Sequence, residues 1–218
     1  MIIDPYTWRK VSVTSKSFVT KYIVSIKFDR PTDYRFKPGQ YCIVRIPNQI
    51  SRTVRQYSFA SGPNDDEMEL LIQREPNGVA SNWFYECHQG DKIEITQAFG
   101  NFTIGENTEH LTCFAGKVGI APFISMMRYY PHIRFSIVYA TSSREEMIDL
   151  SSIKGKNDIY SVTTSDGKRV TEDFIKTLSK TSTYMLCGSK HFTDSISDLL
   201  TGCDIKQEQV LLESFTLQ

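Results

Sequence analysis

The chain has 218 residues, 40% hydrophobic and 23% charged, which is typical of a globular protein with one large domain or two smaller ones. Its 25 basic and 25 acidic side chains give a formal net charge of zero, which argues against nucleic acid or an anionic membrane surface as a partner. Residues 1–10 lack an apolar leader and no apolar run has the length of a bilayer span, so we expect no membrane span and a cytoplasmic location.

The five cysteines are odd in number, widely spaced and without a Cys-x-x-Cys pair, and the four histidines are scattered. This pattern argues against a disulfide framework, a metal site or an iron–sulfur cluster bound by this chain alone. We expect reduced thiols and no metal ligands.

The first hundred residues predict six short strands, rich in β-branched and aromatic residues and separated by turn residues. The strands are expected at Val11–Thr14, Tyr22–Phe28, Tyr41–Ile46, Gln56–Ala60, Glu69–Arg74 and Lys92–Thr96. One short helix is expected around Val79–Cys87. Short strands at this spacing favour a six-stranded antiparallel β-barrel, assigned to residues 1–104.

From Leu111 onward, strands and helices alternate, which predicts βαβ units and an α/β domain with a five-stranded parallel sheet, assigned to residues 105–218. The strands are expected at Leu111–Ala115, Arg134–Tyr139, Asp158–Val162, Tyr184–Cys187 and Val210–Glu213. The helices are expected near Pro122–Tyr130, Glu145–Ile153, Thr171–Leu178 and Phe192–Leu200.

The segment Arg55-Gln56-Tyr57-Ser58 combines a cation, an aromatic ring and a hydroxyl on one predicted strand. Arg55 and Tyr57 alternate and therefore share a face. Such a set suits a ligand with a phosphate and a flat ring, although a barrel strand with a surface Arg and a core Tyr has the same pattern.

A hairpin later, Gly78-Val79-Ala80-Ser81 opens the barrel's helix. Glycine permits close backbone approach, and a helix N-terminus attracts anions. Ser81 suits either a helix cap or an anion contact.

In the second half, Gly116-Lys117-Val118-Gly119-Ile120-Ala121-Pro122 follows the first strand, at the place where open α/β sheets bind nucleotides. The segment lacks the spacing of a Gly-x-Gly-x-x-Gly or Walker motif, so an ordinary βα turn is the other interpretation. Cys187-Gly188 and Glu213 end two later strands of the same sheet. These residues could instead have no role in a site, as a buried Cys that packs as a small hydrophobic residue and a Glu that is solvated.

Taken in order, these segments resemble the ferredoxin–NADP reductase family, which has a flavin-binding barrel followed by a pyridine-nucleotide domain. The resemblance implies that Arg55 binds the FAD phosphates, that Tyr57 stacks on the isoalloxazine and that Ser58 bonds near N5. Gln56 belongs to the same segment, and Ile72, Gln73 and Arg74 would line the flavin. Gly78, Val79, Ala80 and Ser81 would hold the pyrophosphate.

In the nucleotide half, the resemblance places Gly116, Gly119, Ala121 and Pro122 on the family's Gly-rich turn. Lys117 and Val118 depart from it, standing where the family has Gly or Ser and then Thr. Ser143 and Arg144 would touch the adenosine ribose or its 2′-phosphate. Cys187, Gly188 and Glu213 would lie beside the nicotinamide, with Phe215 as the terminal aromatic against the flavin.

The expected function is an FAD-dependent NAD(P)H oxidoreductase. Hydride would pass from the nicotinamide to flavin N5, with Ser58, Cys187 and Glu213 at the reaction centre. Electrons would then go to an iron–sulfur protein, a flavodoxin or a small-molecule acceptor. NADPH is favoured over NADH because residues 141–144 include Arg144 and no acidic side chain. Two alternatives are an electron-transfer subunit with a weakened nucleotide site and a reductase of free flavin.

Overall fold

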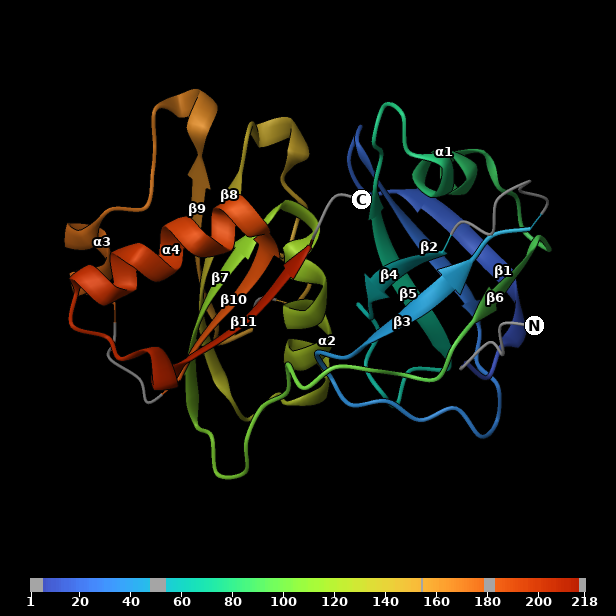
Figure 1. Ribbon diagram of the computed structural model, residues 1–218, viewed down its shortest axis with the longest axis horizontal. Helices are drawn as coiled ribbons and strands as arrows, with labels where there is room; N and C mark the ends of the chain where they lie inside the picture. Colours follow the sequence, from blue (N-terminus) through green and yellow to red (C-terminus); the bar gives the residue numbers. More distant parts are fainter. Residues whose placement is uncertain (1–5, 48–53, 154, 179–182, 216–218) are drawn as a thin grey trace, which may run out of the picture.

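A computed structural model of the protein describes residues 6–47, 54–153, 155–178 and 183–215. Two sheets lie side by side, one built from the first half of the chain and one from the second (Figure 1). This arrangement confirms the predicted antiparallel barrel followed by a parallel α/β half.

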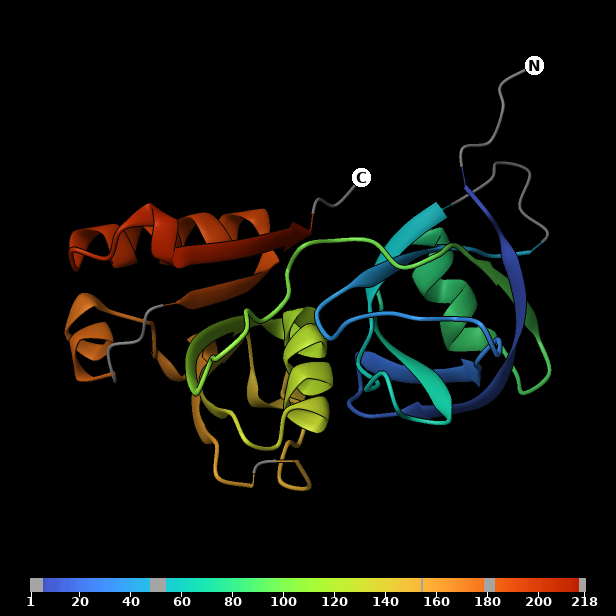
Figure 2. The same ribbon diagram turned by 90° about the horizontal axis from the view of Figure 1, so that it is seen from below.

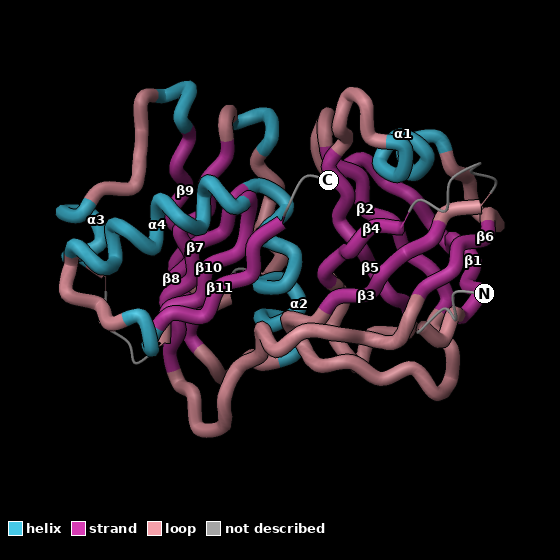
Figure 3. Tube along the Cα trace, in the orientation of Figure 1, coloured by secondary structure: helices cyan, strands magenta, loops and turns pink. Residues whose placement is uncertain are grey.

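The first sheet has six strands in the order β4-β3-β6-β1-β2-β5, with antiparallel pairing throughout. Its strands are β1 (Arg9–Phe18), β2 (Ile23–Asp29), β3 (Tyr41–Arg45), β4 (Val54–Ser58), β5 (Glu67–Gln73) and β6 (Lys92–Ile95). The two edge strands meet at an isolated bridge between Phe59 and Leu70, so the sheet curls into a barrel-like shape. Helix α1 (Val79–Glu86) lies at one end of this half (Figure 3).

The second sheet has five strands in the order β11-β10-β7-β8-β9, and every pairing is parallel. Its strands are β7 (His110–Gly116), β8 (Arg134–Thr141), β9 (Asp158–Thr163), β10 (Tyr184–Ser189) and β11 (Val210–Phe215). The helices are α2 (Ala121–Tyr129), α3 (Glu172–Thr177) and α4 (Lys190–Gly202), with 3-10 turns at Lys117–Ile120, Arg144–Glu146, Thr164–Asp166 and Gln207–Gln209. The inner strands β7 and β8 are buried along nearly their whole length because helices cover both faces of the sheet.

Alternate side chains of β7 divide the core of this half. Cys113 and Ala115 pack in the same apolar cluster as α2, whereas Phe114 packs with buried residues of α3 and α4. Thr171 accepts a bond from the backbone N–H of Phe174, 3.2 Å away, which confirms the helix start expected there.

The helix predicted over Glu145–Ile153 is wrong, because only the 3-10 turn Arg144–Glu146 forms there. Met147 is extended, and Ile148 and Leu150 are buried at alternate positions, a spacing of two rather than that of a helix. The Asp149 side chain accepts bonds from both the N–H and the hydroxyl of Ser151, at 2.9 and 3.0 Å. Local side-chain bonding of this kind competes with helical bonding.

Helix α2 lies between the parallel sheet and the barrel (Figures 1 and 2). Seven of its nine residues, Ala121 through Met127, are buried, because both neighbours cover it. The Phe123 ring meets that of Phe102, from the segment that leaves the barrel, edge to face at 5.7 Å. One apolar cluster therefore contains residues of both halves.

Candidate functional site

A cavity of about 1670 Å³ opens between the two halves and is lined by residues of both. Its walls include the end of β4, the turn before α1, the turn after β7 and the carboxyl ends of the parallel strands. Pockets for single small ligands hold roughly 300–1,000 Å³. The cavity is therefore large enough for more than one such ligand.

Strand β4 brings Arg55, Tyr57 and Ser58 to this cavity. The Tyr57 ring is held edge to face against Phe84 of α1, with centroids 5.7 Å apart. Burial raises the pKa of the Tyr57 hydroxyl, so the ring is neutral and suited to stack against a flat ligand. Arg55 is exposed at the cavity wall and donates to the carbonyl of Val54 at 2.8 Å.

Ser58 Oγ donates a hydrogen bond to Glu213 Oε1 at 3.0 Å, which joins the end of β4 to the end of β11. Burial raises the pKa of the Glu213 carboxyl to about 7, and the bond from Ser58 opposes that shift. Glu213 can therefore hold a proton in the neutral pH range.

Cys187 lies in register with Glu213 on the adjacent strand β10. Its side chain is fully buried in the apolar core and does not line the cavity. Burial raises the pKa of the Cys187 thiol well above its ordinary value, and the Glu213 carboxylate adds to the shift. The thiol is therefore a neutral group on the strand next to Glu213.

The turn before α1 is held by Ser81. Its Oγ accepts from the N–H of Glu75 at 3.1 Å and donates to the carbonyl of Gly78 at 3.2 Å. Gly78 is the N-cap, and no side chain among the described residues caps the helix. A Cβ on Gly78 would lie 2.4 Å from Ser81 Oγ, so this turn requires glycine.

Gly78, Ala80 and Ser81 at the start of α1 line the cavity, the N-cap Gly78 offers no side-chain cap, and Arg55 adds a positive charge to the lining. A helix N-terminus and a guanidinium together suit a phosphate group, and Tyr57 suits a flat ring. These groups fit a flavin dinucleotide.

The turn after β7 packs directly on the end of β10. A Cβ on Gly119 would lie 2.2 Å from the carbonyl oxygen of Cys187. A Cβ on Gly116 would lie 2.9 Å from the Phe192 ring, and one on Gly188 would lie 2.8 Å from it. Gly119 therefore permits a close approach of two backbones, and Gly116 and Gly188 leave room for the Phe192 ring.

Lys117 has a left-handed backbone, with φ of +52°, a conformation that costs a side-chain-bearing residue roughly 1–2 kcal/mol. Its Nζ lies 3.4 Å from a carboxylate oxygen of Glu146, which also accepts from the N–H of Ser142 at 3.0 Å. This ion pair joins the turn after β7 to the turn after β8. Lys117 and Val118 both line the cavity.

The structure brings most of the predicted site residues to one cavity. Those that line it are Arg55, Gln56, Tyr57, Ser58, Gln73, Gly78, Ala80, Ser81, Gly116, Lys117, Val118, Ala121 and Phe215. Those that do not line it are Ile72, Arg74, Val79, Gly119, Pro122, Ser143, Arg144, Cys187, Gly188 and Glu213.

Ile72, Arg74 and Arg144 are held by contacts outside the cavity. The Ile72 side chain is buried in the barrel core. Arg74 donates to Asn82 Oδ1 at 2.9 Å and lies over the Tyr85 ring. Arg144 Nε bonds to Asp166 Oδ2 at 2.8 Å, so its guanidinium is held against the turn after β9.

Other residues line the cavity that the motifs did not indicate, among them Leu71, Lys168, Arg169 and His191. Lys168 and Arg169 follow the carboxyl end of β9, the edge of a parallel sheet where ligands bind, so a basic pair at that position is a usable signal. His191 carries no spacing that marks it in the sequence.

In the described part of the chain, no cluster of His, Cys, Asp and Glu has the composition of a metal site. The helices of that same part are too short or too polar to cross a bilayer.

Comparison with known proteins agrees with this geometry. Residues 10–104 match the family described as the oxidoreductase FAD-binding domain. The chain is 27% identical to the flavohemoprotein of Halalkalibacterium halodurans, over 83% of this chain and 52% of that protein. It is 28% identical to the reductase component of propane 2-monooxygenase from Mycolicibacterium goodii, over 90% of this chain and 64% of that protein. The chain thus spans less than two-thirds of these curated relatives.

Among solved structures, the ferredoxin NADP+ reductase of Neisseria gonorrhoeae, solved with bound FAD and NADP, superposes with a TM-score of 0.83 at 20% identity. The match covers 95% of this chain and 98% of that one. The superposition shows that the two halves have the fold of this reductase, and the match over residues 10–104 agrees with the resemblance to the ferredoxin–NADP reductase family. The description of the family that residues 10–104 match names FAD, which bears out FAD as the expected cofactor.

Proposed function

We propose that the protein is an FAD-dependent NAD(P)H oxidoreductase that takes hydride from a nicotinamide and passes electrons to a separate acceptor. The observation that carries this proposal is the 3.0 Å bond between Ser58 and Glu213, at a cavity lined by both halves. It places a hydroxyl of the FAD-binding half against a carboxyl of the parallel-sheet half. Two ligands, one from each half, would meet there.

FAD, when bound, supplies the hydride acceptor and the release of single electrons. The chain supplies binding and orientation. Arg55 and the start of α1 at Gly78 neutralise the phosphates, and Tyr57 holds the flat ring. Residues 1–104 are proposed as the flavin domain.

Residues 105–218 are proposed as the nucleotide domain, with the dinucleotide against the turn from Gly116 to Pro122. Gly119 lets this turn pack closely on the Cys187 backbone, at the end of the sheet where open α/β sheets bind nucleotides. Lys117 offers a cation at that turn, and Phe215 offers an aromatic ring on the same cavity wall.

Glu213 and Ser58 have a proton-holding role in this proposal. With a pKa of about 7, the Glu213 carboxyl is present in both protonation states near neutral pH. Ser58 Oγ, bonded to it, can relay a proton between that carboxyl and the cavity. Cys187 is a buried, apolar neighbour of Glu213 on the adjacent strand.

For nucleotide choice, we propose NADPH. Arg144 lies at the turn after β8, and Lys168 and Arg169 line the cavity from the turn after β9. A 2′-phosphate would find the cations Lys168 and Arg169 there. The acidic partner that a ribose diol requires would have to be Glu172 or Asp198, which line the same cavity. The KM values for NADPH and NADH decide between them, and a lower value for NADH would reverse the choice.

We propose that the electron acceptor is an iron–sulfur protein, a flavodoxin or a small molecule. We also propose that the protein acts in the cytoplasm. The relatives named above are a flavohemoprotein and the reductase component of a monooxygenase. The test is reduction of a cytochrome or dye reporter by the NADPH-reduced protein, with and without added ferredoxin or flavodoxin.

A second candidate is an electron-transfer subunit that has lost its own nucleotide reactivity. The strained Lys117 and the apolar Val118 favour it, because they replace small or polar residues at the nucleotide turn. Stopped-flow mixing of the flavin-loaded protein with NADPH and with NADH separates the two. Bleaching of the flavin absorbance supports the first candidate, and stable absorbance with both nucleotides supports the second. A protein that purifies colourless yet reduces added riboflavin would instead be a reductase of free flavin.

A further inference from the structure

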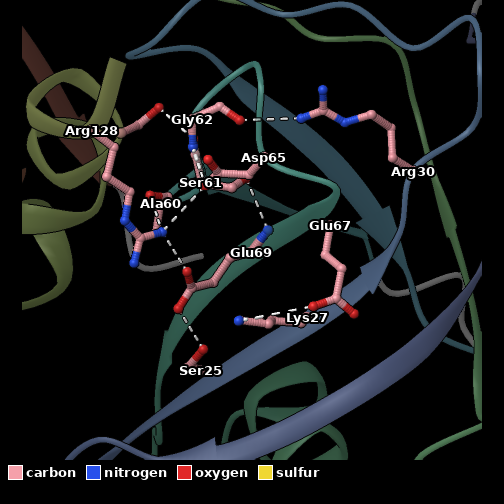
Figure 4. A network of polar contacts seen from close by, with 11 residues as sticks. Ser25, Lys27, Arg30, Ala60, Ser61, Gly62, Asp65, Glu67, Glu69 and Arg128 are labelled. Atoms are coloured by element: carbon pink, nitrogen blue, oxygen red, sulfur yellow. Dashed lines mark hydrogen bonds and ion pairs between the residues drawn. The ribbon is translucent and has the colours of Figure 1, made fainter. Parts of the chain in front are cut away.

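The two halves are joined by a polar network at the far end of helix α2 from the nucleotide turn (Figure 4). Arg128, in the last turn of α2, donates to Glu69 Oε2 at 2.6 Å and to the carbonyl of Ala60 at 3.0 Å. Asp65 lies 3.7 Å from the same guanidinium nitrogen. One side chain of the parallel-sheet half therefore contacts three positions of the barrel half.

The partners of Arg128 are themselves fixed. Glu69 is 8% exposed and accepts from Ser25 Oγ at 2.6 Å, and its backbone N–H donates to Ser61 Oγ at 3.0 Å. From α2, Ser125 Oγ donates to the carbonyl of Ser61 at 2.6 Å. We call Arg128, Ser125, Glu69 and Ser61 the interdomain clamp. A buried carboxylate with its bonds satisfied on both sides holds a rigid geometry.

Both barrel strands that line the flavin side of the cavity adjoin this clamp, β4 just after its end and β5 near its start. On β4, Ser58 is followed within three residues by Ala60 and Ser61. On β5, Glu69 shares a face with Leu71 and Gln73, which line the cavity. The clamp therefore contacts β4 and β5, the two strands whose residues line the flavin side of the cavity.

At its other end, α2 begins at Ala121, which lines the cavity directly after the nucleotide turn. Its nine residues form a strut about 13 Å long. A buried helix transmits displacement as a rigid body, so movement at Arg128 moves the turn carrying Lys117 and Gly119.

The geometry points to Arg128 as a positioning residue: through Glu69 and Ala60 it fixes how the nucleotide turn lies against the flavin strands. This inference rests on the proposed function for its kinetic consequence. Hydride transfer falls steeply when donor and acceptor move apart, so a loosened clamp slows the step without removing either binding site.

The test compares Arg128→Gln and Glu69→Gln with two matched controls in the flavin-loaded protein. Glu67→Gln alters a carboxylate two residues along β5 that faces Lys27 within the barrel. Arg134→Gln breaks an ion pair to Asp158 within the parallel sheet. Neither control pair joins the two halves.

Stopped-flow reduction at saturating NADPH should be at least tenfold slower in both clamp variants and unchanged in the controls. Flavin content and the Kd for NADP+ should stay within twofold of the parent protein. The long-wavelength absorbance of a stacked nicotinamide–flavin pair should weaken in the clamp variants alone.

Arg128→Lys, which keeps a cation for Glu69, should recover part of the rate. Equal rates in Arg128→Gln and Arg134→Gln would overturn the inference, as would a slowing explained wholly by lost flavin or lost nucleotide affinity.

Calorimetry separates this inference from the proposed function, because it needs no nucleotide. The parent protein should unfold in one transition, and Arg128→Gln should split it into two as the halves uncouple, with Arg134→Gln remaining single. If NADPH and NADH both fail to reduce the parent protein, the proposed function fails and the calorimetric result alone decides. A single transition in Arg128→Gln would then refute the clamp.

Discussion

Ser58 and Glu213 are hydrogen-bonded at 3.0 Å although 155 residues separate them in the chain. One stands at the end of an antiparallel strand of the barrel, the other near the end of the parallel edge strand β11. Because each half contributes one partner, the contact exists only when both halves are folded and docked.

Replacing Ser58 with Ala removes the bond that holds the pKa of Glu213 down, so that pKa should rise above about 7. We expect flavin reduction by NADPH to be about tenfold slower, the size of effect that a hydrogen bond to a charged group gives. A stopped-flow pH profile from 6 to 9 measures both changes. Ser161→Ala, at an exposed position on β9, is the control, and an unshifted profile in Ser58→Ala would contradict the prediction.

Glu213 should also make the stability of the flavin-free protein depend on pH. Its folded pKa of about 7 is higher than the ordinary value of 4.5, so between these values the folded state binds more protons than the unfolded chain. This contribution to stability is fully present below pH 4.5 and is lost as pH rises through 7. Urea unfolding at pH 5 and pH 8 should show a smaller pH difference in Glu213→Gln than in the parent protein. The exposed Glu106→Gln should behave like the parent, and an equal loss in both variants would show that Glu213 is not the group responsible.

Gly119→Ala should damage the nucleotide turn, because the new Cβ would lie 2.2 Å from the Cys187 carbonyl oxygen, a backbone atom that cannot swing aside. Overpacking of this kind costs about 1–3 kcal/mol of unfolding free energy. Flavin reduction should slow as well, since Cys187 is in register with Glu213. Gly105→Ala is the matched control because nothing lies within 4 Å of its Cβ position. Equal urea midpoints for the two variants would argue against the close packing.

Lys117→Asn tests the cation at the nucleotide turn. Asn tolerates the left-handed backbone at φ of +52°, so the turn should keep its shape while the charge is lost. We expect NADP+ to bind about three- to tenfold more weakly, with a shallower dependence on salt. Titration at two ionic strengths measures this, with Lys190→Asn, an exposed residue paired to Asp194, as the control. An unchanged Kd would show that Lys117 only pairs with Glu146 and does not contact the nucleotide.

The order of the two halves could be predicted because the sequence pattern changes near residue 105. Before it, the pattern is that of successive strands, and after it strands alternate with helices. Arg55, Tyr57 and the Gly78–Ser81 turn could be predicted because each pairs a residue type with a local backbone geometry. The helix expected at 145–153 failed where Asp149 bonds locally to Ser151 and the chain extends. The division of the chain at residue 104 stays a prediction, as do the individual cofactor-binding roles.

The clamp could not have been read from the sequence, because Glu69 and Arg128 are ordinary charged residues on an ordinary strand and helix. Their proximity comes from the docking of two sheets, which depends on tertiary packing over a separation of 59 residues. The partial burial of Glu213 cannot be seen in the sequence for the same reason, since a carboxylate near a strand end is normally solvated.

The clamp also bears on how such proteins can be recombined. A chimera that took its barrel from one relative and its parallel-sheet half from another would bring together a Glu69 position and an Arg128 position that had not been matched. A barrel carrying Glu69 without an arginine opposite would bury an unneutralised carboxylate at the seam. A functional chimera would therefore have to take helix α2 and residues 60–69 from the same relative. The segment that must be exchanged as one piece thus includes residues from both halves.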